Sequence, residues 1–156
     1  MIYRLANIVG SRSTHGVIFD FFKKLSESPS ELEILTDGTQ KKSYLHVSDC
    51  IDAMLLAIEK TSNQVDIFNI GSEDQVDVMT IASLMVEERG LKNVKFKLTG
   101  GIDGGRGWIG DVKNMLLDVS KLKGLGWKPR FNSLEAVRRT IREILEEDVA
   151  KIRNRP

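Results

Sequence analysis

Runs of residues with the apolar pattern of strands alternate along this chain with runs that have the apolar period of helices. Strand patterns cover residues 1–10, 32–35, 44–47, 65–71 and 94–98, and helical patterns cover 14–25, 51–60, 77–89 and 132–145. This alternation is typical of chains in which helices cover a largely parallel sheet, because parallel strands need a crossover between them. We therefore predict an α/β fold in a single domain over residues 1–156.

The first ten residues are apolar on both parities of a strand, apart from Arg4 and Asn7. This pattern predicts a strand that is buried on both faces of a parallel sheet. Nothing before it supplies a neighbouring strand, so we expect the chain to be the later part of a longer protein. Asn7 lies near the carboxyl end of this strand, where it either contacts a ligand or ties down the following loop.

The stretch from Asp37 to Asp49 has the signals of a turn, a strand and a helix start, with Ser48 or Asp49 as the expected helix cap. Lys41 and Lys42 lie where the turn leads into the strand. From that position one ammonium can reach an anionic ligand held in a cleft. The alternative is that both are ordinary surface lysines.

The helix that follows is predicted over residues 51–60. Its apolar residues recur at helical spacing, so we expect them to form its buried stripe: Ile51, Met54, Leu55 and Ile58. The last helix starts at Asn132 or Ser133, and the residues beyond Asp148, up to Arg155 and Pro156, are expected to fray.

Glycines cluster between Thr99 and Asp111, directly after a predicted strand. A phosphate-binding loop for a dinucleotide would need a helix to begin at once, and no helical pattern follows. A mobile loop that carries Arg106 and Trp108 suits a lid, with the arginine pairing with phosphate and the indole covering an apolar or aromatic face. The alternative is a surface loop whose Trp108 packs into the core.

Composition argues against several classes of function. The 156 residues carry 23 basic and 22 acidic side chains and show no stripe of basic and aromatic residues, which argues against a nucleic-acid partner. Cys50 is the single cysteine and there are two histidines, so we expect neither a disulfide nor a metal site. The unpaired cysteine fits a reduced setting, so we expect a cytoplasmic protein. Because no apolar run has membrane length, we expect no membrane partner.

Five motifs occur in a fixed order. They are Arg4-x-x-Asn7-x-x-Gly10, the run from Asp37-Gly38-Thr39-Gln40 to Tyr44-Leu45-His46-Val47-x-Asp49, Phe68-Asn69-Ile70-Gly71, Gly110-Asp111, and Asp118-x-Ser120-Lys121 followed by Leu125-Gly126-Trp127-Lys128-Pro129. Together they resemble the carboxyl-terminal part of the extended short-chain dehydrogenase/reductases, the NAD-dependent sugar-nucleotide epimerases and dehydratases.

Within that family the chain is most similar to the archaeal-type UDP-glucose 4-epimerases, through Arg12-Ser13-Thr14-His15-Gly16-Val17 and Gly105-Arg106-Gly107-Trp108. The resemblance covers nearly the whole chain. It implies the edge strands of a Rossmann-type parallel sheet with a small α/β substrate-binding cap.

The resemblance also implies that catalysis and substrate binding belong to different parts of the complete enzyme. In the family, a Tyr-x-x-x-Lys pair on a helix deprotonates the sugar 4-hydroxyl while NAD takes the hydride, and a glycine-rich turn binds the NAD pyrophosphate. Neither motif is present here, since Tyr3 and Tyr44 are the two tyrosines and neither has a lysine four residues later. We therefore expect the N-terminal NAD-binding half to be absent, and the chain by itself to have no catalytic residue, to be inactive and not to bind NAD.

By position, the resemblance implies that Asn7 contacts the substrate diphosphate. It implies that the backbone of Leu5 and Ala6 lines the nicotinamide end of the cofactor site. Lys42 falls where many family members carry an arginine on the diphosphate or ribose, so a compact charge replaces a bidentate fork.

Four further residues are assigned to the substrate site in the same way. Trp108 takes the place of the second phosphate arginine of the family, and Arg106 is expected to supply that charge from two residues earlier. His15 and Val17 fall near the helix start that borders the sugar nucleotide.

The function predicted from the resemblance is the UDP-sugar-binding portion of an NAD-dependent UDP-glucose/UDP-galactose 4-epimerase, which when complete interconverts the epimers through a keto intermediate. Two alternatives stay open: a non-catalytic sugar-nucleotide-binding or interaction module, and one subunit of a split epimerase or dehydratase. Because the edge of the first strand would be unpaired, we expect self-association or pairing with an N-terminal NAD-binding half.

Overall fold

The computed structural model describes residues 1–153, and their side chains through residue 150. In chain order the elements are β1 (Ile2–Leu5), β2 (Asn7–Val9), α1 (Val17–Glu27), β3 (Glu31–Ile34), β4 (Lys41–Lys42), β5 (Tyr44–His46), α2 (Val47–Lys60), β6 (Ile67–Ile70), β7 (Val76–Asp77), α3 (Val78–Glu88), β8 (Lys95–Leu98), β9 (Asn114–Met115), α4 (Ser120–Gly124) and α5 (Ser133–Arg153). The predicted α/β class is confirmed.

The strand predicted over residues 1–10 is divided at Ala6. Its first part, β1, pairs in parallel with β6, and its second part, β2, pairs in parallel with β5. The Ala6 amide still donates to the Ile70 carbonyl oxygen at 2.8 Å, so the division falls where the chain changes partners. β3 pairs in parallel with β8, and β4 lies between β7 and β9.

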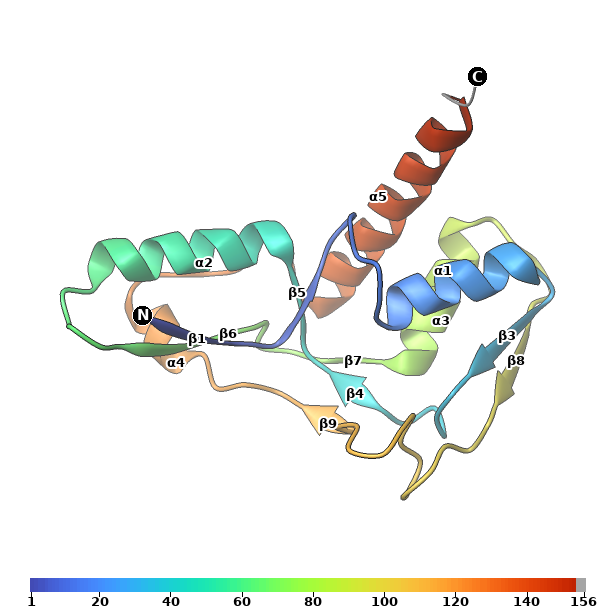
Figure 1. Ribbon diagram of the computed structural model, residues 1–156, viewed down its shortest axis with the longest axis horizontal. Coiled ribbons are helices and arrows are strands. Elements are labelled where there is room, and N and C mark those ends of the chain that lie inside the picture. Colours follow the sequence, from blue (N-terminus) through green and yellow to red (C-terminus); the bar gives the residue numbers. More distant parts are fainter. Residues whose placement is uncertain (154–156) are drawn as a thin grey trace.

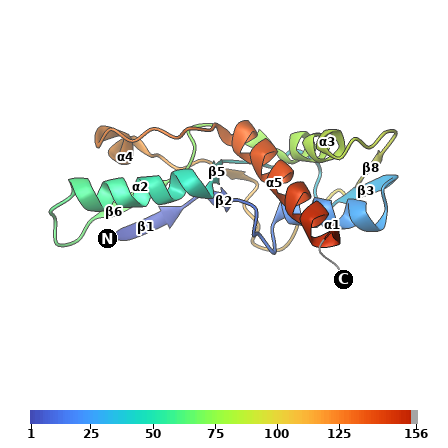
Figure 2. The same ribbon diagram turned by 90° about the horizontal axis from the view of Figure 1, so that it is seen from above.

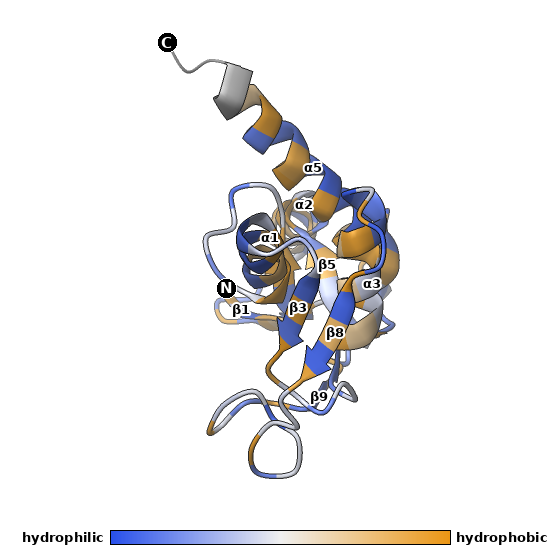
Figure 3. Cartoon of the chain, turned by 90° about the vertical axis from the view of Figure 1, so that its right-hand side faces the viewer, coloured by the Kyte–Doolittle hydropathy of each residue, from blue (hydrophilic) through white to orange (hydrophobic). Residues whose placement is uncertain are grey.

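Two hydrophobic cores lie at opposite ends of an elongated molecule. In Figures 1 and 2 one end contains β1, β6, α2 and α4, and the other contains α1, α3, β3, β8 and most of α5. Phe68 and Trp127 belong to the first core, and Phe21 and Ile141 belong to the second. On the outer face of β3 and β8, polar residues form cross-strand pairs such as Glu31 opposite Lys95 (Figure 3). The strands β4 and β5 connect the two ends.

The prediction for the buried stripe of α2 is wrong for three of its four residues. Ile51, Leu55 and Ile58 are 50%, 61% and 58% exposed, whereas Met54 is half-buried and packs against the first core. The fully buried residues of the helix are small or polar: Asp49, Cys50, Ala53 and Ala57. The two alanines let the helix lie close to the strands β2, β5 and β6. Ile51, Leu55 and Ile58 face away from the rest of the described chain.

The first strand is also less buried than predicted. Ile2 and Leu5 of β1 are 49% and 47% exposed, because β6 is the one strand paired with β1 in the described part of the chain. The apolar face of α2 and the open edge of β1 are therefore the parts of the α2 end that lack a covering neighbour.

The start of α2 and the end of α5 differ in detail from the sequence prediction. α2 is capped by His46, whose Nδ1 accepts from the Ser48 amide, and not by Ser48 or Asp49. α5 continues to Arg153, past the predicted fraying point at Asp148, while Arg155 and Pro156 lie outside the described residues. None of the helices in residues 1–153 is long and apolar enough to span a membrane.

Candidate functional site

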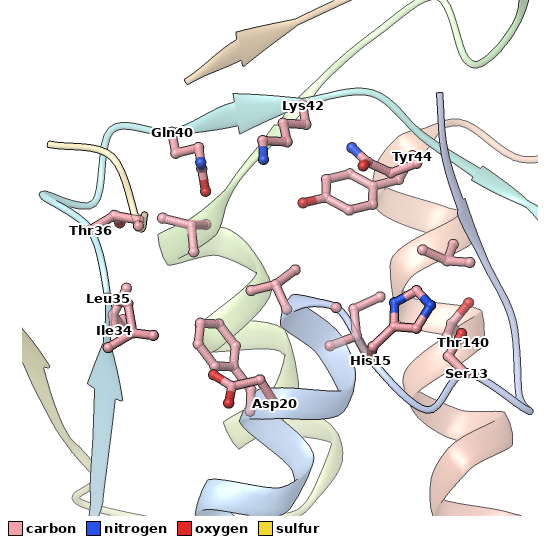
Figure 4. Close-up of a pocket in the computed structure, with 18 of the residues that line it drawn as sticks. Ser13, His15, Asp20, Ile34, Leu35, Thr36, Gln40, Lys42, Tyr44 and Thr140 are labelled. Atoms are coloured by element: carbon pink, nitrogen blue, oxygen red, sulfur yellow. The ribbon is translucent and has the colours of Figure 1, made fainter. Parts of the chain in front are cut away.

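A cavity of about 510 Å³ lies beside the second core, whose residues Phe21, Ile34 and Val78 are among those that line it. Its walls come from the segment linking β2 to α1, from α1 itself, from β3, β4 and β5, and from α5 (Figure 4). Apolar side chains such as Val17, Phe21 and Leu35 form much of the surface, with polar groups placed among them. A volume of this size and an apolar lining with few polar groups are typical of small-molecule sites.

The cavity brings together most of the residues that the sequence assigned to ligand binding. Those in its wall are Ala6, Asn7, His15, Val17, Lys42 and Trp108. Asn7 is also tied into the fold, because its amide nitrogen donates to the Ser43 carbonyl oxygen at 3.2 Å. The fold thus gathers residues that are up to about a hundred positions apart.

Two of the assigned residues are outside the cavity wall. Leu5 lies at the open edge of β1. Arg106 belongs to a tight turn in which it pairs with Ile102, and its Nη1 donates to the Asp103 carbonyl oxygen at 2.6 Å. The guanidinium therefore makes its hydrogen bond within its own loop.

Lys42 is held by a buried carboxylate. Its Nζ lies 2.8 Å from Asp111 Oδ1, and the two side chains are 14% and 1% exposed. Asp111 Oδ2 accepts from Gln40 Nε2 at 2.5 Å and from the Gly107 amide at 3.2 Å. Lys42 is therefore not an ordinary surface lysine, whereas its neighbour Lys41 is exposed.

The electrostatics of this cluster favour its charged form. Burial by itself would raise the pKa of Asp111, but the hydrogen bonds from Lys42, Gln40 and the Gly107 amide outweigh burial and hold the pKa below its ordinary value. The Trp108 ring centroid lies 5.5 Å from Lys42 Nζ, within the range of a cation–π contact. An anionic ligand beside Lys42 would contact an ammonium group that the Asp111 carboxylate already pairs with and holds in place.

The glycine-rich loop is anchored at its base. Lys113 Nζ bonds Asp37 Oδ2 at 2.6 Å and the Gly104 carbonyl oxygen at 2.7 Å. Gly105 has a φ of 93°, and a Cβ there would collide with the Asp37 carboxylate, so the turn requires glycine. Trp108 is 59% exposed at the cavity, so the alternative in which it packs into the core is wrong.

Sequence reasoning did not assign several polar residues of the cavity. Tyr44 projects from β5 into it (Figure 4), and burial followed by the charge of Asp111 raises the pKa of its phenol. The phenol therefore stays protonated at neutral pH and can donate a hydrogen bond. Gln40 lies in the motif that begins at Asp37, but Thr140 reaches the cavity from α5 and no local signal indicates it.

Metal ligands are not clustered in the described side chains. No group of three or more His, Cys, Asp or Glu residues there is placed to hold an ion. The chemistry that this cavity offers is consequently recognition by one cation, hydrogen bonds and apolar contact.

Lys113→Met is expected to raise the pKa of Asp37 from about 2 toward its ordinary value of 3.8, because the hydrogen bond from Lys113 is the largest cause of the depression. A depressed carboxyl pKa contributes stability that is present above the ordinary value and lost as the pH falls toward 2. The variant should lose less stability over that interval. An NMR titration of the Asp37 carboxyl carbon measures the shift, with Lys41→Met as the control. An unchanged midpoint would mean that Thr39, the other hydrogen-bonding partner, causes the depression.

Comparisons with known proteins agree on one family. Residues 1–71 match the model described as "NAD dependent epimerase/dehydratase family". A putative UDP-glucose 4-epimerase of Methanocaldococcus jannaschii is 28% identical over 144 residues, which are 90% of this chain and 44% of that protein.

Two solved structures are similar in fold and sequence. A UDP-galactose 4-epimerase is 39% identical with a TM-score of 0.78, over 93% of this chain and 45% of that one. A UDP-glucose 4-epimerase from Thermotoga maritima, solved with UDP-glucose, is 30% identical with a TM-score of 0.73, over 94% of this chain and 46% of that one. The chain spans slightly less than half the length of each of these relatives.

Proposed function

We propose that this chain, which belongs to the NAD-dependent epimerase/dehydratase family, forms the UDP-sugar-binding part of a UDP-glucose/UDP-galactose 4-epimerase. The observation that carries the proposal is that Asn7 and Lys42, which are far apart in the sequence, line one cavity, and that Asp111 of the Gly110-Asp111 motif pairs with Lys42 there. The relatives at 28–39% identity, which are UDP-glucose or UDP-galactose 4-epimerases, support the same function.

In the proposed complex the diphosphate lies beside Lys42, the one lysine or arginine among the described residues of the cavity wall. The Trp108 indole covers this position from the glycine-rich loop, and Asp111 keeps the ammonium in place. Leu35 and Phe21 offer an apolar surface to the nucleoside. The protonated Tyr44 hydroxyl and Asn7 are placed to hydrogen-bond polar groups of the ligand.

NAD, the cofactor after which the family is named, supplies the hydride acceptor when it is bound in the complete enzyme. The residues of this chain fit contact with one end of it, because Ala6 lines the cavity and Leu5 is exposed at the carboxyl end of β1, the end at which parallel sheets bind ligands. The glycines between Thr99 and Asp111 do not open a helix, so they do not form a pyrophosphate site. The role proposed for this chain is to bind and orient the sugar nucleotide.

Two uncovered features favour a partner that completes the sheet. The exposed apolar face of α2 and the open edge of β1 lie together at the same end of the molecule (Figure 1). An NAD-binding half could pair a strand with β1 and cover Ile51, Leu55 and Ile58, in one chain or as a split enzyme. Without it, we expect concentration-dependent self-association in sedimentation velocity, and a monomer at every concentration would contradict this.

The free, buried thiol of Cys50 supports the cytoplasm as the compartment.

A calorimetric titration of the chain tests the proposed function directly. UDP and UDP-glucose are each expected to bind without NAD, since the cavity is already formed, and NAD alone is expected to give no heat. Absence of binding by both uridine ligands would contradict the proposal that this chain binds the substrate by itself. Equal binding of UDP-glucose and NAD would contradict the assignment of the cavity to the sugar nucleotide.

A further inference from the structure

Residues 11–16, which connect β2 to α1, form a part of the cavity wall that the fold holds loosely. In the described chain, the backbone of residues 11–15 makes one backbone–backbone hydrogen bond, from the Ser13 amide to the Gly10 carbonyl oxygen at 3.4 Å. Arg12, Thr14 and His15 are exposed. Because exposed backbone with few hydrogen bonds opens at a low cost in free energy, this segment is the part of the wall that can move.

Both ends of the segment are fixed. Before it, Val9 pairs with β5, and a Cβ on Gly10 would lie 2.7 Å from Val47 Cγ1, so the chain leaves β2 in close contact with α2. After it, α1 is held by buried residues of the second core. Gly16, the N-cap of α1, has a φ of 91° and makes no side-chain cap bond, and a Cβ there would meet nothing within 4 Å. Residues 11–16 can therefore change conformation without disturbing either core.

The glycine-rich loop, in contrast, is held by several hydrogen bonds. The amides of Ile102 and Arg106 each donate to the other's carbonyl oxygen at 2.8 Å, and the Gly107 amide donates to Asp111 Oδ2 at 3.2 Å. With Lys113 anchoring its base, this loop presents Trp108 from a fixed position.

The side chains of residues 11–16 are arranged as a lid requires. Ser13 and His15 line the cavity, whereas Arg12 and Thr14, which alternate with them, do not. Figure 4 shows Ser13 and His15 on the segment that leads into α1, while Lys42 projects from β4. A ligand beside Lys42 would therefore have the segment on a different wall of the same cavity.

We infer that residues 11–16 are the lid of the cavity, which closes onto the bound sugar nucleotide and brings the Ser13 hydroxyl and the His15 imidazole into hydrogen bonds with it. The inference rests on the proposed function. In this arrangement the glycine-rich loop is a fixed wall. Closure gives the polar groups of the segment partners on the ligand and shields that ligand from water.

Amide hydrogen exchange followed by mass spectrometry tests the lid in the chain as it stands. Without ligand, residues 11–16 should exchange fast and residues 102–107 slowly. With saturating UDP-glucose, exchange in residues 11–16 should slow by about 10-fold or more, because the closed lid must open before its amides exchange. Slow exchange of residues 11–16 without ligand would overturn the inference, and so would bound UDP-glucose that leaves their exchange unchanged.

Two double variants of the segment form a matched pair. Ser13→Ala/His15→Ala removes the inward polar groups and should weaken the binding of UDP-glucose by about 10-fold in calorimetry, the size of two modest hydrogen bonds. The ligand should then protect residues 11–16 less. Arg12→Lys/Thr14→Ala changes the outward side chains and keeps the charge, so it should bind and be protected like wild type. Equal losses in the two variants, or no loss in the first, would overturn the inference.

The failure of this inference can be told apart from that of the proposed function. If wild type binds neither UDP nor UDP-glucose, the proposed function fails and the lid falls with it. If wild type binds UDP-glucose and the protection appears in the glycine-rich loop instead of residues 11–16, the proposed function stands and the lid assignment is overturned.

Discussion

Lys42→Ala is expected to weaken the binding of UDP and UDP-glucose by about 10- to 150-fold, which corresponds to the roughly 1.5–3 kcal/mol of a charge-assisted contact. Lys42 is the cation of the cavity wall, and its Nζ is fixed at 2.8 Å from Asp111. No other lysine or arginine of the described wall can replace it. Calorimetry at constant ionic strength measures the loss.

The matched control for this variant is Lys41→Ala. Lys41 precedes Lys42 on the same strand, but it is exposed and does not line the cavity, so its removal should leave the affinity unchanged. Equal affinities of wild type and Lys42→Ala would contradict the placement of the diphosphate. Arg106→Ala should also leave binding unchanged, because the guanidinium bonds within its own loop.

A second control separates binding from folding. Lys42→Ala leaves the Asp111 carboxylate, 1% exposed, with two neutral donors and no cation, so some stability is lost as well. The double variant Lys42→Met/Asp111→Asn removes both charges and should recover part of that stability without recovering affinity. Recovery of both would mean that the effect of Lys42→Ala on binding is a consequence of misfolding.

Asp49→Ala is expected to lower the free energy of unfolding by about 2 kcal/mol, because it removes the shared acceptor of two part-buried backbone amides and of Arg130 Nε. Asp49 is 2% exposed, and its carboxylate accepts from the amides of Arg130 and Phe131 at 3.0 and 3.2 Å and from Arg130 Nε at 2.7 Å. These bonds join α2 to the segment that leads into α5. Urea denaturation followed by circular dichroism measures the change.

Asp52 provides the matched control, since it contacts the same arginine from the same helix. Its carboxylate is 57% exposed and bonds Arg130 Nη2 at 2.7 Å. Asp52→Ala should cost about 0.5 kcal/mol or less, as is usual for exposed ion pairs. Similar losses for the two variants would show that the ion pair, and not the backbone bonds of Asp49, holds the two segments together.

The family resemblance and the Rossmann-type fold class expected from the motifs are confirmed by the matching family model and by the two solved epimerases with TM-scores of 0.73 and 0.78. Local patterns were sufficient for this, because the period of apolar residues and the turn and cap residues act within a few positions of one another. The motif positions also indicated Asn7 and Lys42, both of which line the cavity.

Contacts between residues that are far apart in the sequence could not be predicted from local patterns. Lys42 and Asp111 are 69 positions apart, and their pairing follows from the meeting of β4 with the glycine-rich loop. Arg106 was assigned as a phosphate ligand together with Lys42, but in the folded chain its guanidinium bonds the Asp103 carbonyl oxygen and it does not line the cavity. Whether a charged side chain faces a ligand depends on partners that only the folded chain supplies.

The sequence by itself determined the α/β class, the order of the main elements and the family resemblance, because these depend on short-range periodicity and on motifs. Only the tertiary structure decided which face of α2 is buried, where the first strand changes partners, and that Thr140 joins the cavity. A helix with apolar residues on more than one face can pack in several rotations. The neighbouring elements decide which rotation the helix adopts, and here the small residues Ala53 and Ala57 are the ones buried against the strands.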